Sequence, residues 1–235
     1  MPGHRHWRCE TEDRRAISGI MRFSLPLLCL LALPPTLARA AAPAPAVEQT
    51  SDAAIVASVQ NYLNGLHTLK ARFLQVAPNG TLARGTAWME RPGRMRFQYD
   101  PPTPFLLVAG HGFVLFRDTK LDQTTNIPIG QTPLGILLAD HINLSGGGVA
   151  ATAVRRLPGE VQVTLVRTAS PSEGSLTLSF ATDPLALRQW TVTDAQRQRT
   201  TVTLYDVQLG GTFAPALFNP NAPMVNPQTQ GGGAG

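Results

Sequence analysis

The sequence predicts a mainly β domain in which one antiparallel sheet of about eleven short strands curls into a barrel or an open half-barrel. Short runs with alternating apolar and polar residues follow one another closely, and Gly, Pro and Asn turns separate them. Tight turns between strands favour an antiparallel meander over βαβ units. Only two segments have a helical pattern, and a sheet of this size exceeds what one helix can cover, so we expect it to curl around both helical segments.

The first forty residues have the pattern of a secretory signal peptide. Met21-Arg22 precedes an apolar run over 23–33, and Ala38-Arg39-Ala40 supplies a cleavage site. A run of about eleven residues is too short to cross a bilayer, which needs about 20. We therefore expect 1–40 to be removed from a soluble exported protein, with 1–20 an over-long start or a miscalled start codon, and 41–52 to be a linker.

The first expected helix follows this linker. Ser51 or Asp52 can cap it, and it extends to Leu66. Its apolar positions recur at three- and four-residue intervals, at Ile55, Val59, Tyr62, Leu63 and Leu66.

Two groups of strands follow, with the second helical segment between them. The expected strands are 69–75, 82–91, 94–99, 105–109, 113–118, 123–127, 149–157, 160–167, 175–180, 187–194 and 200–209.

The strand 94–99 has the clearest alternation in the chain. Met95, Phe97 and Tyr99 share one face. Arg94, Arg96 and Gln98 lie on the other face, which we expect to be solvated. Aromatic residues form only 6% of the chain, whereas Leu, Val, Ala and Met are plentiful. We therefore expect a deformable interior with few large aromatics.

The central apolar segment begins at Thr132. Thr132 can cap a helix with Pro133 at its first position, and the helix is expected to extend to Asp140. Leu134, Ile136, Leu137 and Leu138 make it too apolar to lie on a surface alone.

Arg91 is the one charged residue whose position calls for an explanation. It has the same strand parity as Ala87 and Met89, so a guanidinium ends an apolar face. A strand-end arginine can extend its side chain to water. Otherwise, the guanidinium needs a partner.

The remaining polar residues predict neither an enzyme nor a metal site. His67, His111 and His141 have no metal-ligand spacing, and both cysteines, Cys9 and Cys29, lie in the leader. No cofactor motif and no nucleophile motif is present. Six of the 20 Lys and Arg residues and three of the 15 acidic residues lie in positions 1–40. The rest is close to neutral, with scattered arginines, which argues against nucleic-acid binding.

Several short motifs occur in a recognisable order. They are Phe73-Leu-Gln75, the stretch GTAWMERP that ends in Arg91-Pro92, Tyr99 followed by Pro101-Pro102, Leu107-Val108, Gln123-Thr124 and Thr132-Pro133-Leu134. With this order and spacing, from about Ile55 to Phe218, the sequence resembles the LolA-type periplasmic carriers of outer-membrane lipoproteins. The resemblance implies an unclosed antiparallel barrel with helices acting as a lid over an apolar cavity.

The resemblance also implies a location, partners and site residues. It implies a monomeric periplasmic carrier with acylated lipoproteins as cargo, an inner-membrane ABC-type releasing complex as partner and an outer-membrane lipoprotein as acceptor. The carrier domain would be 53–222, followed by a disordered tail at 223–235. Arg91 would latch the lid by hydrogen bonds to its backbone. The expected cavity residues are Phe73, Met89, Met95, Phe97, Tyr99 and Leu107, with Met95 at the rim; the expected lid residues are Pro133, Leu134, Ile136, Leu137 and Leu138.

Other functions remain open at this point. A relative of such a carrier could bind another lipid or a glycolipid, or act as a static module that binds a partner protein. A secreted hydrolase on a β scaffold is a further alternative, although no nucleophile–base pair is visible in the sequence.

Overall fold

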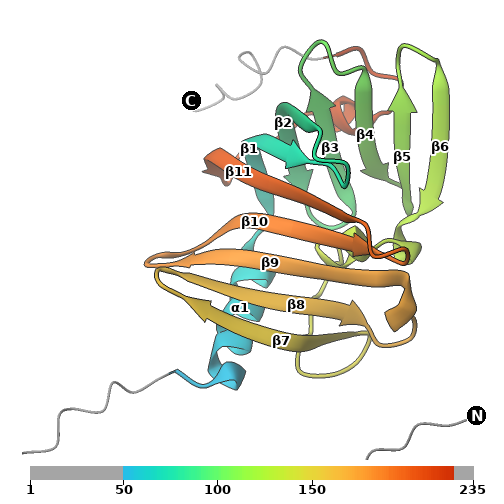
Figure 1. The fold of residues 1–235 in the computed structure, drawn as a ribbon. Helices are drawn as coiled ribbons and strands as arrows, with labels where there is room; N and C mark the ends of the chain where they lie inside the picture. Colours follow the sequence, from blue (N-terminus) through green and yellow to red (C-terminus); the bar gives the residue numbers. More distant parts are fainter. Residues whose placement is uncertain (1–49, 225–235) are drawn as a thin grey trace, which may run out of the picture. The chain divides into compact units, whose positions relative to one another are not determined.

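The computed structural model describes residues 50–224, which form one antiparallel sheet of eleven strands with helical segments against it. The strand order is β6-β5-β4-β3-β2-β1-β11-β10-β9-β8-β7 (Figure 1). The strands β6 and β7 are therefore the two edges, and the sheet is not closed. This confirms the predicted fold class, an unclosed antiparallel sheet with a helical cover.

The strands lie close to their predicted positions. Their bounds are β1 Thr68–Val76, β2 Leu82–Glu90, β3 Arg94–Tyr99, β4 Phe105–Gly110, β5 Phe113–Asp118, β6 Gln123–Pro128, β7 Val149–Leu157, β8 Glu160–Arg167, β9 Gly174–Thr182, β10 Leu185–Asp194 and β11 Arg199–Leu209. The helical segments are α1 Asp52–Gly65 and four short 3-10 turns, η1 Ile129–Gln131, η2 Pro133–Ile136, η3 Pro171–Glu173 and η4 Pro215–Phe218.

Two meanders build the sheet, and they meet at β1 and β11. Strands β1 to β6 form the first meander and β7 to β11 form the second. The pairing of Phe73 with Leu204 lies in the seam between them. The segment 129–148 connects the two outer edges, so it has to cross one face of the sheet. We call this face, which α1 also covers, the inner face.

The helix α1 begins where the sequence predicts. The Ser51 hydroxyl accepts a hydrogen bond from Ala54 N at 3.2 Å, which satisfies one free N–H of the first turn. Val59 and Leu63 are fully buried in the main core together with the inner face of the sheet. No helix in the described part of the chain is long and apolar enough to span a membrane.

The central segment is shorter in its helical part than predicted. It forms only η2, and the expected helix to Asp140 is wrong. Thr132 does cap it, because its hydroxyl accepts a hydrogen bond from Gly135 N at 3.2 Å. The carbonyls after η2 accept hydrogen bonds from the β2–β3 turn: Leu138 O accepts from Gly93 N and Ala139 O accepts from Arg91. Tertiary partners therefore replace the bonds that would have continued a helix.

The opposite, outer face of β2 and β3 is covered, and the prediction of a solvated face there is wrong. Arg96 is 0% exposed, and Trp88 packs in a second core cluster with Phe213, Leu217 and Phe218. The chain after β11 provides this cover, and Arg96 donates to Leu217 O at 3.2 Å and to Pro223 O at 3.3 Å. The alternation of strand 94–99 is real, but its polar side faces the C-terminal segment.

The predicted domain bounds stay predictions. The signal peptide at 1–40 and most of the linker lie outside the described residues, as does the tail from 225. The contact of Pro223 with Arg96 extends the packed domain past residue 222.

Candidate functional site

A cavity of about 310 Å³ lies between the inner face of the sheet and η2. We call it the inner cavity. Strands from both meanders supply its walls, and Pro133 and Leu134 of η2 line it together with Thr132. Its other lining residues are Gln75, Phe97, Tyr99, Leu107, Val114, Phe116, Ile127, Trp190, Val192, Thr200 and Val202. The lining is mostly apolar and contains no charged side chain.

A row of aromatic rings runs beside and along this cavity. The ring centroids are 5.9 Å apart for Trp190 and Phe97, 4.9 Å for Phe97 and Phe73, and 5.1 Å for Phe73 and Tyr99. The row continues through Phe105, which is 6.0 Å from Tyr99. The expectation of an interior with few large aromatics is therefore wrong, because the curled sheet gathers scattered rings in one place. Tilted and edge-on contacts of this kind favour a well-defined wall.

Tyr99 places a hydroxyl at this apolar wall. The hydroxyl donates a hydrogen bond to Gln75 Oε1 at 2.7 Å. Burial raises the pKa of Tyr99 to about 12. The phenol is therefore neutral near pH 7, and the cavity offers no ionised group to a ligand.

The predicted cavity residues divide into two groups. Phe97, Tyr99 and Leu107 line the inner cavity. The other three, Phe73, Met89 and Met95, are buried in the main core and do not line it. Met95 is 1% exposed, so its expected location at a solvent-exposed rim is wrong in this conformation.

The predicted lid residues divide in a similar way. Pro133 and Leu134 face the inner cavity. The other three, Ile136, Leu137 and Leu138, are buried in the core cluster that also contains α1. The segment therefore covers the cavity with its first turn and is anchored by the residues that follow.

Arg91 connects the sheet with both elements that cover it. Its Nη1 donates to Leu63 O and, at 3.3 Å, to Leu66 O at the end of α1. Its Nη2 donates to Ala139 O at 2.6 Å and to Asp140 O at 3.4 Å. The acceptors on the central segment thus lie just beyond the predicted stretch 134–138, and the end of α1 is an additional partner.

The environment of Arg91 explains why a guanidinium is stable there. The carbonyls at the C-terminal end of α1 carry partial negative charge. Leu63 O already accepts from Leu66 N at 3.3 Å, and the guanidinium adds charge-assisted donors to Leu63 O and Leu66 O. Arg91 is 9% exposed, and burial lowers its pKa while the nearby Asp140 opposes this. A strand-end arginine in water is therefore excluded for this conformation.

Gln60 and Asn64 of α1 also bind the central segment, and neither was among the site residues expected from the sequence. Asn64 Nδ2 donates to Ile142 O at 2.9 Å, and Ile142 N donates to Asn64 Oδ1 at 2.9 Å. Gln60 Oε1 accepts from Leu144 N at 2.8 Å. Their four-residue spacing, directly after Val59 and Leu63, is a signal in the sequence, since it places two amides beside the buried stripe.

The start of the central segment is held separately by β8. Arg167 Nη2 donates to Thr132 O at 3.4 Å and to Ile129 O at 3.5 Å. Gly135 of η2 packs closely against the backbone of η1, because a Cβ added to Gly135 would be only 2.2 Å from Ile129 O. A side chain at this position would push η2 away from Ile129 and Arg167.

The geometry suits reversible enclosure of an apolar ligand. An engineered cavity of about 150 Å³ holds one benzene, so 310 Å³ corresponds to roughly a dozen carbon atoms. A longer chain requires the cover to move. Hydrogen bonds to the backbone of the central segment hold the cover in place, and their side-chain partners are Arg91, Gln60 and Asn64. Such bonds can open without a chemical step.

Comparisons with known proteins found several proteins that are similar to this chain. The curated outer-membrane lipoprotein carrier protein of Pseudomonas aeruginosa is 28% identical over 184 residues, which are 73% of this chain and 86% of that protein. An uncharacterized protein of Rickettsia prowazekii is 22% identical over 121 residues, and this chain spans only 56% of its length. A LolA superfamily protein from Nitrosomonas europaea matches in structure with a TM-score of 0.40 and 8% identity, over 69% of this chain and 96% of the other.

A family model gives the wider match. The model described as "Outer membrane lipoprotein carrier protein LolA" matches residues 64–221, which contain β1 to β11, Arg91 and η2. This match covers more than half of the chain and confirms the resemblance inferred from the motifs. The chain belongs to the LolA family of outer membrane lipoprotein carrier proteins.

Proposed function

We propose that this protein is a periplasmic carrier that encloses the acyl chains of lipoproteins and moves them from the inner to the outer membrane. The observation that carries this proposal is Arg91, which joins the β2–β3 turn to both elements that cover the inner face of the sheet, the face that also holds the apolar cavity. In this role Arg91 is a latch: its bonds form in the closed state and break when cargo enters.

The covering elements must move for this function. Three acyl chains of about fifteen methylenes each exceed the dozen or so carbons that the closed cavity holds. The cargo would therefore displace η2 and α1 from the sheet. The aromatic wall formed by Phe97 and Tyr99 would then face the chains, and the Arg91 bonds would be lost.

The energetics of acyl transfer require a partner at the inner membrane. Three chains at ~0.8 kcal/mol per methylene amount to a gross ~36 kcal/mol, whereas noncovalent affinity saturates near ~20 kcal/mol. A carrier alone cannot extract such cargo from a bilayer. We propose an ATP-driven ABC-type complex as the source and a lipoprotein of the outer membrane as the acceptor, with the carrier acting as a monomer.

The location follows from the same proposal. A signal peptide at 1–40 would direct export, and N-terminal sequencing of the exported protein should begin at or near Ala41. A purified form that retains the apolar run 23–33 would contradict this location.

Two other functions compete with lipoprotein transport. Another lipid or a glycolipid would fit the same apolar cavity. A secreted hydrolase is less well supported, since the charge-free lining of the inner cavity includes no histidine and no carboxylate that could act as a general base.

Mass spectrometry of the protein purified from its own periplasm separates these functions. The proposal predicts copurifying triacylated peptides or intact lipoproteins, and a variant with the cavity filled, Leu107→Trp, should copurify less of them. The control is Leu115→Trp. Leu115 lies beside Val114 on β5 but does not line the cavity. Copurified phospholipid or glycolipid without acylated peptide would support the alternative carrier.

A further inference from the structure

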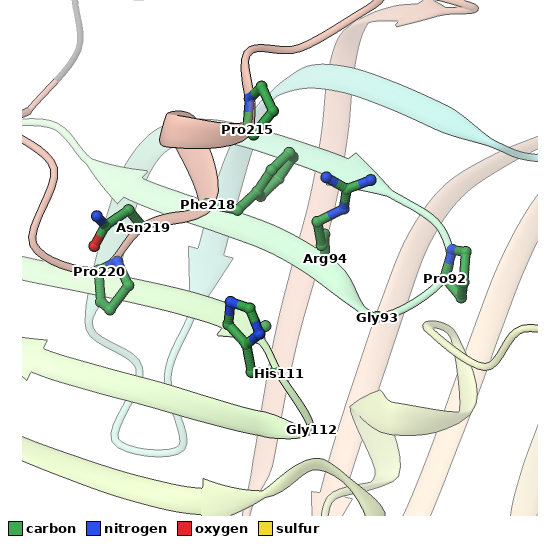
Figure 2. A pocket seen from close by; sticks show the side chains of 10 residues that line it. Pro92, Gly93, Arg94, His111, Gly112, Pro215, Phe218, Asn219 and Pro220 are labelled. Carbon is green, nitrogen blue, oxygen red and sulfur yellow. The ribbon is translucent and has the colours of Figure 1, made fainter.

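A second pocket lies on the outer face of the sheet, and the proposed transport mechanism does not use it. We call it the outer pocket, and its volume is about 620 Å³. It is formed by 92–94, where the β2–β3 turn leads into β3, by 110–112, where β4 leads into the next turn, and by the C-terminal segment with Pro215 and 218–220 (Figure 2). It shares no lining residue with the inner cavity.

The outer pocket combines basic and apolar groups. Arg94, at the start of β3, and His111, in the β4–β5 turn, line it, and no Asp or Glu is among its lining residues (Figure 2). The guanidinium carbon of Arg94 lies 5.6 Å from the centre of the Phe218 ring. Pro92, Pro215 and Pro220 supply further apolar surface.

Arg94 has N–H donors that can bind a ligand in addition to Glu90. One of its terminal nitrogens donates to Glu90 Oε1 at 2.5 Å, and Glu90 itself does not line the pocket. A guanidinium has five N–H donors in a fixed plane, so a carboxylate can bind beside Glu90. The glycines 93, 110 and 112 have no side chains, so the backbone of a guest can approach closely.

We propose that the outer pocket binds an acidic, partly apolar peptide segment of a partner protein. A carboxylate of the segment would bind Arg94 and His111, and a neighbouring apolar side chain would pack on Phe218 and the prolines. A peptide fits better than a membrane surface, because the site is concave and presents one guanidinium. Anionic bilayers attract clusters of several exposed basic residues instead.

The outer pocket is connected to the Arg91 latch through four consecutive residues. Arg94 lines the pocket, Gly93 N donates to Leu138 O at 2.9 Å, and Arg91 donates to α1 and Ala139. A guest that shifts the turn 92–94 therefore acts on the bonds that hold the cover. This part of the inference rests on the proposed function: a docked partner would loosen the latch at the moment of cargo transfer.

Nuclear magnetic resonance of the isotope-labelled mature protein tests the binding site. The probe is the peptide acetyl-GELEPG-amide, and its neutral match is acetyl-GQLQPG-amide. The acidic peptide should shift the amide signals of Gly93, Gly110 and Gly112 saturably, and the neutral peptide should bind about tenfold more weakly or less, since it lacks the charge-assisted bonds.

Three variants check the origin of these shifts. Arg94→Gln should weaken the acidic peptide about tenfold, whereas Arg199→Gln removes an exposed arginine at the start of β11 and should leave binding unchanged. Gly110→Leu keeps both basic groups and fills the pocket; an added Cβ there meets only Phe218 O, at 3.8 Å, which is an ordinary van der Waals contact. It should abolish binding by occupying the space. The latch coupling predicts that bound peptide also speeds hydrogen exchange of the Gly93 amide.

Clear results would overturn the inference. Equal binding of both peptides, or no saturable shift at ~2 mM peptide, removes the acidic-peptide site. Shifts produced only by vesicles of phosphatidylglycerol would assign the face to a membrane. These measurements use no lipoprotein, so they fail independently of the carrier function; binding without faster exchange at Gly93 would remove only the coupling to the latch.

Discussion

Asn64 and Ile142 exchange two hydrogen bonds, as a pair of residues in an antiparallel sheet would. The Asn64 amide donates to the Ile142 carbonyl and accepts from its N–H, both at 2.9 Å. Gln60 adds a bond to Leu144 N at 2.8 Å. The helix α1 and the segment 138–144 are thereby joined to each other. Arg91 then holds this joined lid to the β2–β3 turn.

Asn64→Ala should destabilise the protein by about 1–3 kcal/mol, because it leaves the N–H and the carbonyl of Ile142 without partners in a buried place. Urea unfolding followed by circular dichroism measures the change. Asn61→Ala is the matched control, since Asn61 is exposed on the same helix, and it should change the free energy of unfolding by less than about 0.5 kcal/mol. Equal effects of the two substitutions would show that the amide bonds do not fix the lid.

Tyr99 should make the stability depend on pH in the alkaline range. Its pKa is raised to about 12 in the folded protein, whereas an unfolded tyrosine titrates near ~10. The folded state therefore disfavours the ionised phenol. The contribution of the neutral Tyr99 phenol to the free energy of unfolding is fully present below pH ~10. It is lost as the pH rises from ~10 to ~12, and its upper limit is about 2–3 kcal/mol.

Alkaline unfolding and tyrosinate absorbance measure this effect. Tyr99→Phe should remove most of the pH dependence in this window and one late-titrating tyrosine signal. Tyr205→Phe, on the exposed side of β11, is the control and should preserve both. A Tyr99→Phe protein with the same alkaline profile as the wild type would show that the phenol is not buried in solution.

Met95→Glu should destabilise the fold and not merely change ligand binding. Met95 is 1% exposed, so the introduced carboxyl would be buried without a partner, which destabilises by about 3–5 kcal/mol when it is ionised. Burial raises the pKa of such a carboxyl above ~4.3. The variant should therefore be most stable below pH ~4.3 and lose stability as the pH rises through the folded pKa.

The control for this position is Met95→Leu, which conserves volume and should cost less than about 1.5 kcal/mol. Thermal unfolding at pH 4 and pH 7 compares the two variants. A Met95→Glu protein as stable as the wild type at pH 7 would place residue 95 at a hydrated rim, as first expected from the sequence.

The strands and the position of the central segment were predictable because their signals are local. Alternation along 94–99 and turns such as Arg91-Pro92-Gly93 determine where strands begin and end. The ordered motifs around Arg91 also predicted the family. Thr132 and Pro133 predicted the correct start of the second helical segment.

The errors arose where distant parts of the chain meet. Arg96 seemed solvated because nothing near it in the sequence shows that the segment after β11 covers it. The wall of the inner cavity includes Trp190, which only the seam between β1 and β11 brings beside Phe97. The central helix stops early because its carbonyls bind Gly93 and Arg91, and neither contact follows from helix propensity.

Arg91→Leu tests the latch, which is the central claim. The substitution removes the donors to Leu63, Leu66, Ala139 and Asp140 and keeps the cavity lining intact. Loading should survive, because the acyl chains still find an apolar cavity. Release should fail, because the closed empty state has lost the bonds that favour it over the open loaded state. Charge-assisted hydrogen bonds contribute about 1.5–3 kcal/mol each, so the loss corresponds to a factor of ten or more.

The most direct measurement is the rate at which preloaded carrier delivers lipoprotein to outer-membrane vesicles. Wild type, Arg91→Leu and Arg188→Leu are loaded equally. Arg188 is the control, because it is exposed on β10 and, in the described part of the chain, its side chain makes no hydrogen bond to the lid. The latch predicts that Arg91→Leu stays a soluble loaded complex and delivers at least about tenfold more slowly than both others. Delivery by Arg91→Leu at the wild-type rate would contradict the latch.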